Sequence, residues 1–213
     1  MSELVSPPSS APVSRSLVAT TKRHAVLLFG LLAIMWLTAL LDILPFLQLN
    51  QHGIHPRTVS GLIGILFAPF LHAGFGHLAA NSIPFIVLGG IVLLGGRTVF
   101  WSVTLFVMLF GGLGVWVFGG AHSNHIGASG LIFGYLGFLL TRGLVERSWT
   151  WSLVALLILL MYGSVLIGVL PLQVGVSWQS HLFGFMAGIG AARLLFSRQR
   201  KLIGGSRTAL ESI

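Results

Sequence analysis

The sequence predicts an all-α polytopic membrane protein with six transmembrane helices. Of its 213 residues, 55% are hydrophobic and only 8% are charged, a composition that ordinary soluble domains do not have. Several apolar stretches reach the roughly 20 residues that a helix needs to cross a ~30 Å hydrocarbon core. The positive charges are also confined to a few segments, which is typical of an oriented membrane protein.

Six apolar stretches are long enough to be membrane spans. We place them at residues 24–44, 78–96, 98–118, 128–145, 150–170 and 180–196. The first follows two basic residues, as a secretory signal would, but it is too long for a signal core and lacks a small-residue cleavage site, so we expect it to be retained. We expect residues 1–21 to be a disordered cytoplasmic tail, 22–196 one membrane domain and 197–213 a basic cytoplasmic tail.

The net charge of +8 is explained by topology, and no nucleic-acid partner is expected. All of the 12 lysines and arginines except Arg57 fall in the two tails, at the ends of the spans next to them, or in the loops near residues 97 and 142–148. This distribution follows the positive-inside rule and predicts that both termini are cytoplasmic. We therefore expect a multi-pass protein of the cell membrane.

The longest connection, residues 45–77, is expected on the outer side. Its apolar part, 60–71, is too short to span and should lie in the membrane interface. The loop 119–127 is rich in glycine and polar residues. Irregular backbone of this kind is tolerated at membrane depth only where protein or water covers it.

Two of the apolar stretches each begin with a reactive side chain. Ser129 stands in Gly127-Ala128-Ser129-Gly130, and His181 begins a run that continues through Gly184 and Gly188. Polar and ionisable groups are costly inside a membrane and usually mark a functional site there. Glycines four residues apart let membrane helices approach closely, so the serine and the histidine can meet.

Helix geometry predicts nearly the same depth for these two side chains. Ser129 lies 13 residues before Arg142, and His181 lies 12 residues before Arg193; the rise per residue converts these separations to about 20 and 18 Å. A hydroxyl and an imidazole at one depth can act as nucleophile and general base. The chain has no cysteine and only four acidic residues, so a Ser-His dyad is favoured.

The second predicted span adds the pattern His72-x4-His77-x3-Asn81. With the serine and histidine motifs, this pattern resembles the rhomboid family of intramembrane serine proteases, in its bacterial type. The resemblance covers about residues 70–196 and implies a six-helix rhomboid-like bundle in a bacterial inner membrane. It implies a serine endopeptidase that cleaves single-span membrane proteins in or beside their transmembrane segments, with no cofactor and no metal.

The resemblance also implies a role for each motif residue. Ser129 would be the nucleophile and His181 the general base, while His77, Asn81 and the Ser129 amide would stabilise the oxyanion. An aromatic residue four positions after the serine, here Phe133, would stack on the histidine. The supporting positions are Gly127, Gly130, Gly184 and Gly188, together with His72, which we expect to hold its loop by hydrogen bonds.

Other interpretations of these residues stay open. Hydrogen bonds between neighbouring helices would explain His77 and Asn81, and ordinary core packing would explain Phe133. A metal site is conceivable because six histidines fall on the expected outer side: His52, His55, His72, His77, His122 and His125. However, the chain has no His-Glu-x-x-His run and no glutamate near these histidines, which disfavours a zinc protease.

Three other classes of membrane protein can be weighed against a serine protease. An aspartyl intramembrane protease needs two aspartates, and the chain contains only Asp42. A transporter lacks support, because the sequence has no repeat symmetry and few buried charges to form an ion path. The principal rival is a non-catalytic rhomboid-like protein that binds client helices; it would be expected to have lost the serine or the histidine, and both are present.

Overall fold

The computed structural model describes residues 13–172 and 175–210. Every regular element among these residues is a helix, apart from one isolated antiparallel bridge between Ile54 and His125. The prediction of an all-helical protein is therefore confirmed.

Most of the α-helices form a bundle, and the other helical elements lie in its connections. The bundle contains α1 (Val13–Leu41), α3 (Phe75–Leu93), α4 (Arg97–Phe106), α5 (Gly112–Phe118), α6 (Ser129–Glu146), α7 (Trp149–Tyr162) and α8 (Trp178–Leu210). The shorter elements are η1 (Leu49–His52), α2 (Val59–Phe67), η2 (Ala68–Phe70) and η4 (Gly163–Val169). A π-helical turn, η3 (Val107–Gly111), joins α4 to α5.

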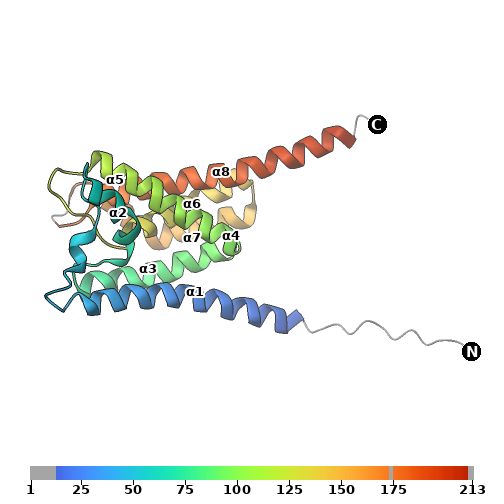
Figure 1. Ribbon diagram of the computed structural model, residues 1–213. Coiled ribbons are helices and arrows are strands. Elements are labelled where there is room, and N and C mark those ends of the chain that lie inside the picture. The colour runs from blue at the N-terminus through green and yellow to red at the C-terminus, as the bar shows by residue number, and fades with distance from the viewer. Residues whose placement is uncertain (1–12, 173–174, 211–213) are drawn as a thin grey trace, which may run out of the picture.

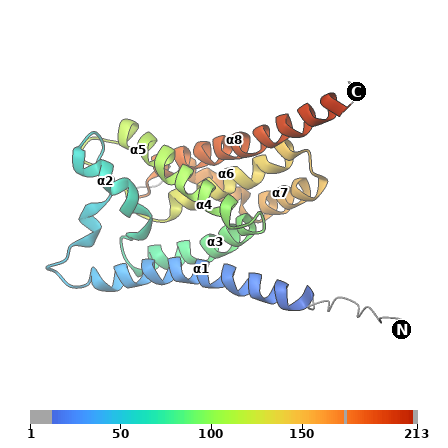
Figure 2. The same ribbon diagram turned by 45° about the vertical axis from the view of Figure 1, so that its right-hand side comes forward.

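The two ends of the bundle differ in content. Figure 1 shows that α1 begins and α8 ends at the same end, and we call this end the terminal face. The opposite end, the loop face, holds α2 and the long connections around it, and Figure 2 shows the same division from another side. The short apolar helices of residues 59–70 therefore lie at one end of the bundle, consistent with a segment too short to span.

Four helical segments are long and apolar enough to cross a membrane. They are Leu17–Leu41, Phe75–Leu93, Arg97–Phe118 and Trp149–Val169, among the residues that the structure describes. They correspond to the first, second, third and fifth predicted spans. The fourth and sixth predicted spans, α6 and α8, are helical but outside this set, and both contain charged residues and several glycines. The chain is thus a multi-pass membrane protein, and the count of six spans stays a prediction.

Two helices extend into segments that the sequence predicts as tails. α1 begins at Val13, within residues 1–21, and α8 continues to Leu210, within residues 197–213. Neither helix contains a proline, so no residue interrupts its backbone hydrogen bonds. The rest of both predicted tails, 1–12 and 211–213, lies outside the described residues.

The centre of the bundle is the close contact between α6 and α8. A Cβ atom added at Gly184 would overlap the Gly130 carbonyl group, and one added at Gly188 would overlap the Gly134 carbonyl group. The two backbones therefore touch where both helices carry glycine, as small residues allow in membrane helices. Large side chains of α6, such as Tyr135, fill the core around this contact.

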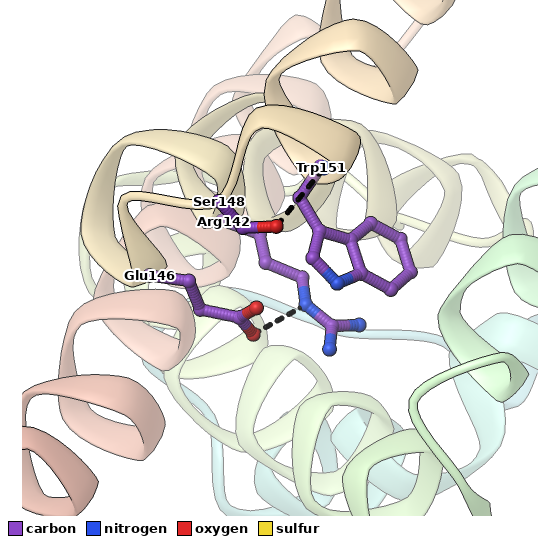
Figure 3. Close-up of polar contacts among 4 residues, drawn as sticks. All are labelled: Arg142, Glu146, Ser148 and Trp151. Atoms are coloured by element: carbon purple, nitrogen blue, oxygen red, sulfur yellow. Dashed lines mark hydrogen bonds and ion pairs between the residues drawn. The ribbon is translucent and has the colours of Figure 1, made fainter.

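At the terminal face a buried arginine joins α6, α7 and α8. The Arg142 Nε donates to Glu146 Oε1 at 2.6 Å, and its guanidinium lies 3.5 Å from the centre of the Trp151 ring (Figure 3). The Phe196 ring of α8 approaches the same guanidinium to 4.8 Å. An ion pair and cation–π contacts offset part of the cost of burying the charge. The Ser148 hydroxyl accepts a hydrogen bond from the backbone N–H of Trp151 and so caps the N-terminus of α7 beside this cluster.

Substitutions on α8 test the α6–α8 contact. We expect Gly188→Ala to lower the free energy of unfolding by about 1–3 kcal/mol, because its methyl group forces two backbones apart. Gly190→Ala makes the same chemical change where the added Cβ would lie 3.4 Å from Phe106 Cε1, an ordinary contact. We expect it to be neutral or slightly stabilising, since alanine favours helix. Unfolding in detergent measures both, and equal stability of the two variants would contradict the close contact.

Candidate active site

Ser129 is the first residue of α6 and is half-buried. Two residues before it, Gly127 has φ +118°, a backbone conformation that other residues rarely adopt. A Cβ atom at Gly127 would lie 2.7 Å from His77 Cε1 and 3.7 Å from Ser129 Oγ. The imidazole of α3 and the serine hydroxyl therefore border the same small space, which a side chain at position 127 would fill.

His72, in the segment between η2 and α3, holds the backbone next to the serine. Its buried ring accepts the Ala128 N–H at Nε2, at 3.2 Å. Burial lowers the pKa of His72 to about 4, with nearby His77 adding to the effect. The ring is therefore neutral near pH 7 and keeps the lone pair that this hydrogen bond needs.

The Asp42 carboxylate lies directly after α1 and forms hydrogen bonds within the loop face. It accepts hydrogen bonds from the backbone and the side chain of Asn50. The Asn50 amide also donates to the His72 carbonyl at 2.8 Å. The one aspartate of the chain thus supports the segment that contains His72, and it forms no hydrogen bond with His181.

His181 lies in the first turn of α8, directly against α6. Its ring stacks on Phe133 with a centroid distance of 4.1 Å and an interplanar angle of 7°. Phe133 is one helical turn after Ser129 on the same face of α6, so the stacked imidazole lies next to the serine. Ser129 Oγ and His181 form no hydrogen bond in the structure; such bonds are often long in a site without substrate.

A backbone carbonyl of η4 fixes the tautomer of this histidine. His181 Nδ1 lies 2.8 Å from the Gly168 oxygen, and a carbonyl oxygen can only accept. The proton of the neutral ring is therefore on Nδ1, which leaves the Nε2 lone pair free. Sequence reasoning missed Gly168, because a glycine in an apolar stretch gives no sign that its carbonyl will face a histidine from another helix.

Asn81 is one turn after His77 on the same face of α3. Its side chain is 8% exposed, and its Nδ2 makes no hydrogen bond within the part of the chain that the structure describes. A buried amide donor without a partner costs free energy. Such a donor is available to a group that enters the site.

A small cavity adjoins the serine segment. It has a volume of about 40 Å³ and is lined by Gly127, Gly130 and mostly apolar side chains of α2, η2, η3 and α5. Its two polar side chains are those of His125 and Ser180. A cavity of this size accommodates a few water molecules or a small side chain.

His125 joins the loop before the serine to the start of α8. Its Nε2 lies 2.7 Å from Ser123 Oγ and its Nδ1 lies 2.6 Å from Ser177 Oγ. Ser177 in turn accepts the Ser180 N–H and so caps α8. Because the Ser123 hydroxyl donates to the Gly120 carbonyl, it must accept from Nε2–H, and neutral His125 then accepts from Ser177.

Burial lowers the pKa of His125, with nearby His55 contributing. A neutral ring fits the hydrogen-bond directions above. In the sequence, His125 was only one of six candidate metal ligands. In the described residues, no group of three His, Cys, Asp or Glu side chains is placed to hold a metal ion. The two serines were missed, because no residue pattern links position 125 to position 177.

The role of His125 in holding α8 can be tested by a matched pair of variants. We expect His125→Asn to lower the free energy of unfolding by about 1–3 kcal/mol, because it leaves two half-buried serine partners unpaired. Amides of residues 178–182 should also exchange hydrogen faster, as mass spectrometry would detect. His122→Asn, three residues earlier and exposed, should change neither measurement. Unchanged exchange in His125→Asn would show that α8 is held by other contacts.

Known proteins are similar to this chain in sequence. Residues 59–198 match the family model described as Rhomboid domain. An uncharacterized protein of Mycobacterium tuberculosis (strain ATCC 25618 / H37Rv) is 43% identical over 195 residues, covering 85% of this chain and 81% of the relative. An uncharacterized protein of Mycobacterium leprae (strain TN) is 43% identical over 184 residues, covering 83% and 73%. The chain therefore belongs to the rhomboid family.

Proposed function

We propose that this protein is an intramembrane serine endopeptidase that cleaves transmembrane segments of membrane proteins with Ser129 and His181. The observation that carries the proposal is the position of the His181 ring. It stacks on Phe133 and donates Nδ1–H to the Gly168 carbonyl, so its Nε2 lone pair is free beside the serine. A histidine held in the tautomer of a general base, next to a hydroxyl, suits acyl transfer.

In the proposed reaction, Nε2 of His181 takes the Ser129 proton as the oxygen attacks the substrate carbonyl carbon. The resulting imidazolium returns that proton to the leaving amine, and the acyl-enzyme is then hydrolysed by water with the same base. The Gly168 carbonyl takes the orienting role that an aspartate plays in a triad. It supplies a dipole and no net charge, which suits a site with little access to water.

Three donors are available to the oxyanion. The Ser129 N–H is at the N-terminus of α6, where backbone amides lack partners within the helix. The Ala128 amide is already bonded to His72, so we assign the Ser129 amide to the oxyanion. We propose His77 and Asn81 as the side-chain donors, since the His77 ring borders the space at Gly127 and the Asn81 amide is unpaired.

The substrates we propose are single-span membrane proteins with a small residue at the cleavage site. The cavity of about 40 Å³ beside Gly127 and Gly130 fits a small side chain. A regular helix hides its carbonyls in its own hydrogen bonds, so the substrate must unwind locally before attack. Helix-breaking residues near the cut would favour this unwinding.

We also propose six spans in a bacterial inner membrane, with the terminal face in the cytoplasm. Counting α6 and α8 as spans gives an even number, and α1 begins at the face where α8 ends (Figure 1). The basic residues at the starts of α1 and α4 agree with the positive-inside rule. Water would then reach the dyad from the outer, loop face.

Replacement of the nucleophile tests the activity directly. We expect Ser129→Ala to reduce cleavage of a model single-span substrate to background in a gel assay with purified protein, because no other hydroxyl replaces Oγ. Ser102→Ala, on α4, removes a hydroxyl of the same kind outside the site and should leave cleavage intact. Undiminished cleavage by Ser129→Ala would contradict the assignment of Ser129 as the nucleophile, whereas no cleavage by the parent protein would favour a non-catalytic protein that binds client helices.

Covalent labelling separates the base from the oxyanion donors. We expect Asn81→Ala and His77→Ala to slow cleavage by about 10²–10³-fold, the usual effect of losing one oxyanion donor. Both should still react with a fluorophosphonate probe, because His181 continues to activate the serine. His181→Ala should lose labelling and cleavage together. Labelling that survives in His181→Ala but fails in His77→Ala would assign the base to His77.

A further inference from the structure

A second cleft opens at the terminal face, away from the candidate active site. It lies between α1 and the beginning of α4 and has a volume of about 660 Å³. Cationic side chains line it from both helices: Lys22 and Arg23 from α1 and Arg97 from α4. The proposed protease reaction uses none of these residues.

Among the described residues, the three cations have no acidic counterpart nearby. All three are exposed, and the one ion pair among the described residues joins Arg142 to Glu146. The other described carboxylate, Asp42, is bonded to Asn50 at the loop face. Three like charges around one cleft repel one another, and an anion in the cleft relieves this repulsion.

The rest of the cleft is apolar and follows the axis of α1. Val26, Gly30 and Ile34 line it at intervals of one helical turn, so it extends about 18 Å from Lys22 toward the middle of the bundle. Gly30 leaves open space, because a Cβ atom there would meet nothing within 4 Å. Trp101 lies at the charged end, where tryptophan rings commonly sit at the level of lipid headgroups.

We propose that this cleft binds an anionic phospholipid, with its phosphate between Lys22, Arg23 and Arg97 and an acyl chain along α1 past Gly30. The charged end and the apolar length together match an amphiphile. Free phosphate would leave the apolar part empty, and a zwitterionic lipid would leave the cations uncompensated. Basic pockets between membrane helices are a known way to hold anionic headgroups. The proposal is independent of the protease reaction.

Native mass spectrometry of the detergent-purified full chain tests the headgroup site. With equal amounts of phosphatidylglycerol and phosphatidylcholine of identical chains, we expect a retained adduct that is mostly phosphatidylglycerol. Lys22→Gln and Arg97→Gln should each weaken its retention about fivefold. Arg193→Gln, an exposed cation of α8 outside the cleft, should not. Equal retention of the two lipids, or an equal loss in Arg193→Gln, would overturn the proposal.

A substitution that leaves the charge unchanged tests whether an acyl chain occupies the apolar part of the cleft. Gly30→Leu fills the open part of the cleft, and we expect it to reduce the phosphatidylglycerol adduct severalfold. Ala33→Leu adds apolar volume on the same helix outside the cleft lining and should have no effect. Circular dichroism and thermal unfolding check that all variants are folded. An adduct insensitive to Gly30→Leu, or one displaced by excess glycerol phosphate, would show headgroup binding alone and overturn the proposed lipid site.

Discussion

The backbone contact between α6 and α8 is the constraint on which the rest of the structure depends. Gly184 and Gly188 bring α8 so close to α6 that a methyl group at either position would overlap a carbonyl of the facing helix. This closeness places the first turns of the two helices side by side, one with Ser129 and the other with His181. A wider separation, of the kind bulky residues impose, would break the stack between Phe133 and the histidine. Packing and chemistry therefore depend on the same glycines.

At the candidate site, backbone groups make contacts that acidic side chains often make in water-soluble serine proteases. The Gly168 carbonyl orients the His181 ring, and the Ala128 amide is held by His72. An ionised carboxylate near His181 would cost much free energy in a site surrounded by apolar helices. A carbonyl dipole fixes the tautomer without that cost. The scarcity of acidic residues in the sequence therefore agrees with a histidine that is oriented by a backbone carbonyl.

The sequence predicts an all-helical membrane protein and the positions of most of its long helices, because both depend on local patterns. Apolar length, glycine spacing and the offset of Phe133 from Ser129 are each visible within one helix. Gly168 and the link from His125 to Ser177 could not be predicted, since each joins residues of different elements and has no residue pattern of its own. The ends of α1 and α8 were also missed: polar residues permit helix, and no proline stops it.

The polar groups at the two ends of the bundle have different structural roles. At the terminal face, Arg142 is buried among the aromatic rings of two other helices, which joins α6, α7 and α8 where no chemistry is proposed. At the loop face, hydrogen bonds accepted by Asp42 and His72, and those that His125 forms, hold the connections around the serine. The buried arginine and the hydrogen-bonded loops thus hold the two ends of α6, and the α6–α8 contact keeps its geometry between them.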